Sequence, residues 1–164
     1  MEGQFREMMA AFPTGVSVVT AISEPAGPLG MTCSALCSLS VDPPSLLVCL
    51  RAQSPTLAVV AASGAFAVNL LHAGAQPVAA LFASGAPDRF DRVTWRPAPL
   101  TGSPALTDAA HTIADCVVDQ IHPAGDHMIV VGMVRAVERL RDRSALLYGF
   151  RQYGHWTHDL APTV

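Results

Sequence analysis

Proline and glycine recur along this chain and divide its apolar sequence into short segments. The chain contains 13 Pro and 12 Gly, and residues 24–28 and 123–125 have the composition of turns. Between the turns, runs rich in β-branched and other apolar residues have the length of strands. The predicted strands span residues 15–22, 29–41, 45–51, 65–71, 109–122, 126–140 and 146–153.

Only short helices are predicted between these strands. Helical spacing of apolar residues, or a Ser-Pro start with a glycine exit, indicates helices over 4–12, 54–63 and 76–82. Because a long alternation of strands and helices is missing, the order favours an antiparallel barrel over a doubly wound sheet. We expect one domain across residues 1–164, with a core from about 5 to 154, a surface connection over 84–107 and a loose tail.

Composition narrows the class of protein. The 164 residues include ten Arg, no Lys and 13 acidic residues, which give a net charge of −3 and disfavour a nucleic-acid binder. Hydrophobic residues make up 51%, which excludes disorder, and charged residues only 14%, which points to a homo-oligomer with an apolar interface. No apolar run approaches the roughly 18 residues of a membrane helix, and no signal peptide is visible, so we expect a cytoplasmic protein without membrane contact.

The cysteines and histidines do not form a metal-site pattern. In the cytoplasm we expect Cys33, Cys37, Cys49 and Cys116 to be reduced thiols. On a strand, four residues span about 13 Å, which is too far for a disulfide between the first two. His155 and His158 resemble a metal pair but have no further ligands nearby, so we predict no metal site.

Common catalytic motifs are absent as well. The chain has no GxGxxG after a strand, no phosphate-binding loop, no GxSxG and no HExxH. With no lysine, Schiff-base chemistry with pyridoxal phosphate is excluded. We therefore expect the protein to use the chemistry of a bound cofactor.

Two segments have features of a ligand site. Residues 30–40, GMTCSALCSLS, combine small side chains with hydroxyls, so a flat ligand could lie against the backbone. Residues 54–56 open a helix, where hydroxyls and N–H groups can bind an anion with help from Arg51 or Arg89. The alternatives are a barrel strand with small inward residues and an ordinary capped helix.

A third candidate is the Gly-Asp-His sequence of residues 125–127, at a turn that enters a strand. His127 could donate to a ligand or act near neutral pH. The alternative is a turn with a surface imidazole.

In this order and spacing, these segments resemble the flavin reductase family, whose members are small reductase components of two-component flavin monooxygenases. The resemblance covers about residues 5–153 and implies a mainly β fold with short helices, an antiparallel Greek-key split β-barrel that binds FMN, and a homodimer. Its motifs are FPTGVSVVT (12–20), GMTCSALCSLSVDPP (30–44), Ser54 with Thr56, FAVNLL (66–71), LFAS…DRF (81–90), GDH (125–127) and LLYGFRQYG (146–154).

The resemblance also implies roles for individual residues. The segment along the flavin ring comprises Thr32, Cys33, Ser34, Ala35, Leu36, Cys37 and Ser38, with Ser40 and Val41 nearby. The phosphate end of the flavin would meet Ser54, Pro55 and Thr56, with Arg89 and Phe90 as a further phosphate or adenylate contact. NAD(P)H would contact His127, the one candidate catalytic residue, together with Phe150, Arg151, Gln152 and Tyr153.

The activity that the resemblance implies is NAD(P)H:flavin oxidoreductase. A hydride would pass from nicotinamide to N5 of FMN or FAD, and reduced flavin would diffuse to a partner monooxygenase. Hydride transfer depends on stacking geometry, so His127 is interpreted as an orienting group. With no basic cluster visible for a 2′-phosphate, NADH is favoured over NADPH. The alternatives are a flavin-binding electron carrier, a flavoenzyme with tightly bound FMN that reduces a small organic acceptor, and a relative of pyridoxamine-phosphate oxidases.

Overall fold

The computed structural model describes residues 1–156, and its main element is a seven-stranded antiparallel sheet. Its strands, in spatial order, are β3 (Gly27–Cys33), β2 (Ser17–Ser23), β6 (Ala65–Leu71), β9 (Ala110–Ala124), β10 (His127–Arg139), β5 (Pro44–Arg51) and β4 (Leu36–Val41). Hairpins β2–β3, β4–β5 and β9–β10 are joined by crossings that place β6 beside β2 and β5 beside β10. The mainly β, Greek-key prediction is confirmed.

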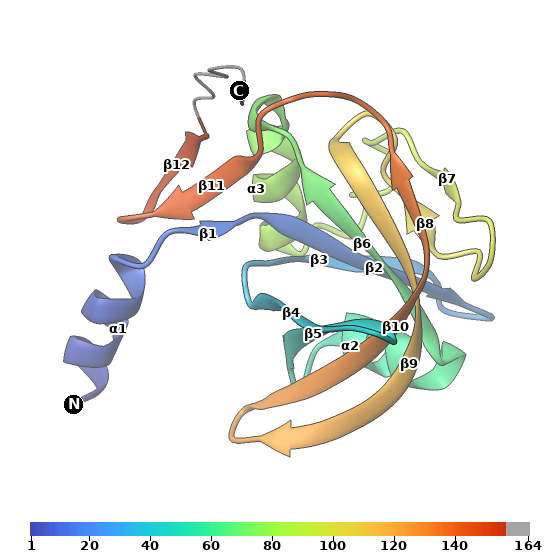
Figure 1. The fold of residues 1–164 in the computed structure, drawn as a ribbon, viewed down its shortest axis with the longest axis horizontal. Helices are drawn as coiled ribbons and strands as arrows, with labels where there is room; N and C mark the ends of the chain where they lie inside the picture. The colour runs from blue at the N-terminus through green and yellow to red at the C-terminus, as the bar shows by residue number, and fades with distance from the viewer. Residues whose placement is uncertain (157–164) are drawn as a thin grey trace.

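The two edge strands of this sheet, β3 and β4, are consecutive in the chain. Only Ser34 and Ala35 separate them, so the sheet must curl until its edges meet at this point (Figure 1). Each edge strand pairs on one side only, β3 with β2 and β4 with β5. The barrel is therefore split along the gap between β3 and β4, which we call the seam.

The barrel interior is filled by large apolar side chains. Phe66, Val48, Leu50, Val68 and Val130 are fully buried in one cluster. Burial of such side chains is the main stabilising contribution in a domain of this size. The register is correspondingly well specified, because a one-residue slip would turn these side chains to the other face.

Helix α2 (Pro55–Ser63) covers one side of the barrel near β2. It buries Leu57, Val59 and Val60, and it ends at Gly64, whose φ of 66° lies in the left-handed region that glycine tolerates. The predicted helix and its glycine exit are confirmed. Ser54 occupies the N-cap position as expected, but its side chain makes no capping hydrogen bond, since the hydroxyl donates to Met31 Sδ at 3.2 Å.

Helix α3 (Gln76–Ser84), which follows a short 3-10 turn (Ala73–Ala75), packs on β3. Phe82 is buried there, and a Cβ on Gly30 would lie 3.0 Å from its ring. The glycine therefore lets helix and strand approach closely. The Thr32 hydroxyl adds a hydrogen bond of 2.6 Å to the Ala79 carbonyl.

Two predicted strands differ in the structure. The extended run 29–41 is two strands, because the chain turns at Ser34–Ala35 from one sheet edge to the other. The strand predicted over 146–153 is a hairpin of β11 (Leu146–Gly149) and β12 (Gln152–His155). Phe150 and Arg151 turn it with φ of 51° and 60°, a conformation that composition did not predict for these two residue types.

Helix α1 (Glu2–Ala10) forms close to its predicted place, but its predicted apolar face is not part of the core. None of the nine residues is buried, and Phe5 and Met8 are more than half exposed. Figure 1 shows the helix projecting from the barrel and leading into β1 (Thr14–Gly15), which pairs with β11.

The connection predicted as a surface loop, 84–107, is partly buried, which corrects that expectation. It contains a small pair of strands, β7 (Arg96–Pro97) and β8 (Pro104–Ala105), and Leu106 is fully buried. Asn69 holds it: its amide donates to the Pro104 carbonyl and accepts from Leu106 N–H. Among residues 1–156, no helix is long and apolar enough to cross a membrane.

Candidate functional site

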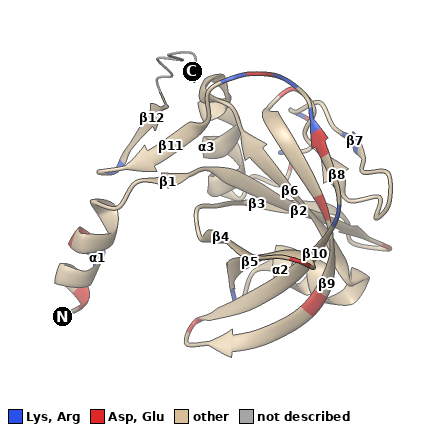
Figure 2. Ribbon diagram, viewed as in Figure 1, with Lys and Arg blue, Asp and Glu red and all other residues tan. Residues whose placement is uncertain are grey.

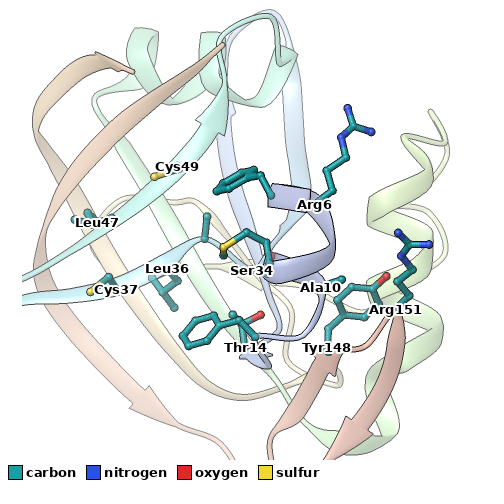
Figure 3. A pocket seen from close by; sticks show the side chains of 15 residues that line it. Arg6, Ala10, Thr14, Ser34, Leu36, Cys37, Leu47, Cys49, Tyr148 and Arg151 are labelled. Carbon is teal, nitrogen blue, oxygen red and sulfur yellow. The ribbon is translucent and has the colours of Figure 1, made fainter. Parts of the chain in front are cut away.

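A pocket with a volume of about 590 Å³ opens at the seam, and we call it the seam pocket. Figure 3 shows Cys37, Cys49 and Leu47 on one wall, facing Tyr148 and Arg151 from the β11–β12 hairpin. The full lining is Phe5, Arg6, Met9, Ala10, Phe12, Thr14, Ser34, Ala35, Leu36, Cys37, Leu47, Cys49, Tyr148, Gly149 and Arg151.

The seam pocket combines apolar walls with unpaired backbone. Because β4 pairs only with β5, the outer edge of the chain at Ser34–Cys37 is not occupied by another strand. Apart from the Ala35 carbonyl, which accepts from Cys49 N–H at 3.0 Å, backbone N–H and C=O groups on this edge can bind the polar edge of a flat ligand. Two guanidinium groups line the pocket: that of Arg6, which pairs with Glu2 at 2.6 Å, and that of Arg151, which supplies positive charge.

The predicted flavin segment divides between three surroundings. Ser34, Ala35, Leu36 and Cys37 line the seam pocket. Ser38, Ser40 and Val41, together with Leu36, line a second hollow of about 430 Å³ between β4, β5, β6, β9 and β10, which we call the apolar hollow.

Thr32 and Cys33 belong to neither of these cavities. The Thr32 hydroxyl is hydrogen-bonded to the Ala79 carbonyl of α3. Cys33 is 5% exposed, and its thiol is directed at the carbonyls of Ala35 and Cys49. Burial raises the pKa of the Cys33 thiol to about 11. Cys33 is thus a core thiol behind the seam pocket.

The predicted phosphate-binding residues lie outside the seam pocket lining. Thr56 is 2% exposed, and the Ser54 hydroxyl already donates to Met31 Sδ. Arg89 is 9% exposed and donates from Nη1 to the Ala86 carbonyl at 2.8 Å, while its buried Nε has no partner among residues 1–156. Phe90 meets the ring of Phe82 edge-on, with 5.2 Å between centroids. Their binding roles stay predictions.

His127 begins β10, opposite Arg51 of β5. Its Nδ1 lies 2.7 Å from Asp126 Oδ1, and this hydrogen bond, followed by the charge of His127 and then that of Arg51, lowers the pKa of the Asp126 carboxyl. The side chain is 37% exposed and does not line the seam pocket within this chain. The structure thus presents an accessible, oriented imidazole at the tip of the β9–β10 hairpin.

The predicted NAD(P)H segment forms the turn and second strand of the β11–β12 hairpin. Arg151 lines the seam pocket, Phe150 and Gln152 are exposed, and Tyr153 packs against Tyr148 with 5.1 Å between ring centroids. Phe150 N–H donates to the Ala10 carbonyl at 2.5 Å, which ties the hairpin to α1.

Helix α1 contributes to the seam pocket, which its sequence did not predict. Phe5 and Met9 of α1, together with Phe12 just after it, line the pocket, whereas the sequence indicated only that they share one face of a helix. The available signal was the isolation of this helix at the chain end, before the first strand. Cys49 and Leu47 were also missed, since alternation on β5 alone does not reveal which face meets the seam.

Within residues 1–156, no group of three or more His, Cys, Asp or Glu side chains could hold a metal ion. The described cysteines are all free. His155 is exposed at the end of β12, and His158 lies outside the described residues.

Comparison with known proteins gives a consistent set of matches. The model of the flavin reductase like domain matches residues 9–157. The flavin reductase (NADPH) of Lentzea aerocolonigenes is 48% identical over 154 residues, covering 94% of this chain and 89% of that protein. The flavin reductase (NADH) of Kitasatospora aureofaciens is 42% identical over 159 residues, covering 96% and 83%.

Solved structures agree with this result. The NADH:FAD oxidoreductase SgcE6 of Streptomyces globisporus C-1027, in complex with NAD and FAD fragments, superposes with a TM-score of 0.89 at 31% identity, covering 97% of this chain and 94% of that one. BorF, the flavin reductase component of a bacterial two-component tryptophan halogenase, superposes with a TM-score of 0.84 at 33% identity, covering 94% and 98%.

Proposed function

This chain belongs to the flavin reductase like domain family, and from that membership we propose that it is an NAD(P)H:flavin oxidoreductase. It takes NADH or NADPH and FMN or FAD, and a hydride passes from the nicotinamide to N5 of the flavin. The seam pocket is the observation that carries this assignment, since it joins an open sheet edge to apolar walls.

The pocket fits the flavin ring in size and in chemistry. Its volume of about 590 Å³ lies within the 300–1,000 Å³ typical of small-molecule sites. The backbone at Ser34–Cys37 would hold the polar edge of the ring, while Leu36 and Tyr148 would contact its faces. Arg151 would attract the phosphorylated end of the ligand.

The residues of the seam pocket bind and orient rather than transfer protons. Its fifteen lining residues include no His, Asp or Glu. Apolar walls exclude water and keep two stacked rings in reactive geometry, which is the main requirement of hydride transfer. Backbone N–H groups along the seam can stabilise negative charge that develops on the bound ring.

We assign His127 to orientation of the nicotinamide coenzyme. Its imidazole is accessible and is held by Asp126. His127→Ala should therefore raise the KM for NAD(P)H about tenfold and change kcat little. Steady-state kinetics at saturating flavin measure both constants, and an equal fall in kcat at unchanged KM would contradict this role.

The reduced flavin produced here would serve a flavin-dependent monooxygenase. Relatives that are 36% and 34% identical are named reductase subunit HsaB of a flavin-dependent monooxygenase. Because reduced flavin is freely diffusible, no fixed contact with the oxygenase is required. We place this reaction in the cytoplasm, where free thiols such as those of the described cysteines stay reduced.

We also propose that the protein is a homodimer. Exposed apolar side chains, Leu39, Val41 and Val137, lie on strands that border the apolar hollow, and Val41 is 89% exposed. An apolar surface of this kind is typical of an interface between subunits. Light scattering after gel filtration should give twice the chain mass, and Val41→Asp with Val137→Asp should give the single chain mass.

The decisive experiment is oxidation of NADH and NADPH, followed at 340 nm, with and without added FMN or FAD. Rates that saturate with added flavin would establish a reductase that uses flavin as a substrate. Flavin that instead stays with the protein through gel filtration and is reduced in place would indicate a tightly bound cofactor. Flavin binding without oxidation of either nucleotide would overturn the assignment and leave an electron carrier.

A further inference from the structure

A second pocket, of about 540 Å³, is rich in arginine, and we call it the arginine pocket. Its cations are Arg139, Arg141 and Arg143, at alternate positions where β10 ends and the chain crosses to β11. Figure 2 shows this connection as the stretch where blue and red alternate above the sheet. No residue is common to the linings of the arginine pocket and the seam pocket.

The arginine pocket carries a net positive charge. Its lining contains three arginines and one acid, Asp142, which pairs with Arg139 at 2.9 Å. Asp108, just outside the lining, lies 3.9 Å from Arg141. Counting both acids, three positive charges face two negative ones, so one positive charge is left over.

One guanidinium is already fixed in place. Arg141 donates to the carbonyls of Thr107 and Asp108 and is only 30% exposed. Carbonyl oxygens orient a guanidinium without neutralising it, so its remaining N–H groups can donate to an anion at little further entropic cost. Within residues 1–156, Arg143 makes no side-chain hydrogen bond or ion pair.

Two further side chains shape the site. Trp156 places a half-exposed indole at one wall, on which an aromatic base can stack. His111 lies on another wall, with Nδ1 2.9 Å from the Thr112 hydroxyl. Burial, then the charges of His72 and Arg139, lowers the pKa of His111, so it enters as a neutral hydrogen-bonding group.

The β11–β12 hairpin connects this pocket to the seam pocket. Ala145, which precedes β11, and Trp156, which follows β12, line the arginine pocket and are joined by a hydrogen bond of 3.3 Å. Tyr148, only three residues beyond Ala145, lines the seam pocket. Three residues of strand span about 10 Å, which is within the length of a dinucleotide.

We propose that the arginine pocket binds the phosphate monoester of a nucleotide. Guanidinium groups match the geometry of phosphate oxygens, and the indole offers a surface for the base. If the nucleotide is NADPH, the bound group is its 2′-phosphate, and in that form the inference rests on the proposed reductase function. If it is a separate nucleotide, the pocket is an independent site.

Calorimetric titration tests the binding directly, with inorganic phosphate and adenosine 2′-monophosphate as probes. We expect both to bind, the nucleotide more tightly, and Arg143→Gln to weaken each about tenfold. Arg135→Gln removes the same charge from an exposed position of β10 outside the pocket and should leave both affinities as in the wild type. No binding to the wild type, or equal weakening by the two variants, overturns the proposal.

Kinetics then identify the source of the phosphate. The ratio of kcat/KM for NADPH to kcat/KM for NADH should fall about tenfold in Arg143→Gln if the pocket takes the 2′-phosphate of the coenzyme. An unchanged ratio together with lost nucleotide binding would assign the pocket to a separate phosphorylated ligand. Failure of the reductase function would show as absent oxidation of both coenzymes, whereas the titration does not depend on activity.

Discussion

Two regions of the barrel differ in whether their backbone polar groups are hydrogen-bonded within the chain. In the connection 98–106, backbone polar groups are hydrogen-bonded to two buried side chains: Asn69 binds Pro104 and Leu106, and Asp115 accepts from the N–H groups of Leu100 and Thr101. At the seam, β3 and β4 do not pair with each other, and β4 with the preceding Ser34 and Ala35 borders an open pocket.

This difference predicts which substitutions change stability and which change ligand binding. A buried polar group that loses its partner retains its full desolvation cost, so the connection is sensitive to single substitutions. The seam is already exposed to solvent, and changes there alter what can bind without exposing the core. We therefore expect variants of the two regions to affect different measurements.

The largest effect is expected at Asn69, which is fully buried and forms four hydrogen bonds. Asn69→Ala should lower the free energy of unfolding by about 3–4 kcal/mol, because it leaves several buried groups unpaired. At about 2–4 °C per kcal/mol, Tm should fall by roughly 10 °C. Gln120→Ala, at an exposed amide, is the control. If Asn69→Ala lowers the free energy of unfolding by no more than about 1 kcal/mol beyond this control, the contrast between the two regions is contradicted.

The next largest effect is expected on the free energy of unfolding at alkaline pH, through two buried thiols. Burial raises the pKa of Cys33 to about 11 and that of Cys116 to about 12, from an ordinary value of 9.0. Between pH 9 and 11 the unfolded chain has lost these protons while the folded chain keeps them, so stability is complete below pH 9 and decreases as pH rises.

The two thiols together should lower the free energy of unfolding by about 2.7 kcal/mol per pH unit in this window. Urea titrations under reducing conditions at pH 8, 9, 10 and 11 measure the slope. Cys116→Ala should halve it, and a slope that is the same in the variant would show that other groups cause the alkaline loss.

At the seam we expect a change in affinity at constant stability. Ala35→Leu fills part of the seam pocket and should weaken FMN binding about tenfold, which corresponds to about 1.4 kcal/mol. Flavin fluorescence titration gives the affinity and thermal melting gives Tm. Ala62→Leu on the exposed side of α2 is matched in size and should change neither quantity. A Tm loss without a change in affinity would assign Ala35 to packing.

The smallest effect separates two neighbouring methionines of α1. Met9 lines the seam pocket, whereas Met8 does not, and neither is buried. Met9→Ser should weaken FMN binding about threefold, Met8→Ser should leave it unchanged, and both should alter stability by less than about 0.5 kcal/mol. The same flavin fluorescence titration measures both affinities. Equal effects of the two variants would contradict the placement of α1 in the pocket wall.

Much of the fold follows from local sequence. Helix α2 is predicted with its glycine exit because Ser-Pro and Gly64 act within a few residues. The hairpin at Phe150–Arg151 is missed, since its left-handed turn is imposed by pairing of β11 with both β1 and β12. The connection over 84–107 is misjudged because its partners, Asn69 and Asp115, lie on other strands.

The candidate site was likewise predicted only in part. Resemblance placed residues 34–37 at the flavin, and the structure puts these four residues together in the seam pocket. It does not bring His127 or residues 54–56 into that pocket within one chain, so their roles stay predictions. The expected single domain over 1–164 also stays a prediction.

The sequence by itself determined the class of this protein: turn spacing specified short antiparallel strands, and the ordered motifs specified the family. Only the tertiary structure decided that β3 and β4 meet as opposite edges of one sheet, that α1 lines a pocket, and that three arginines share another. The reason is physical. Turn and capping preferences act over a few residues, whereas a pocket is formed by side chains that the chain brings together from more than a hundred residues apart.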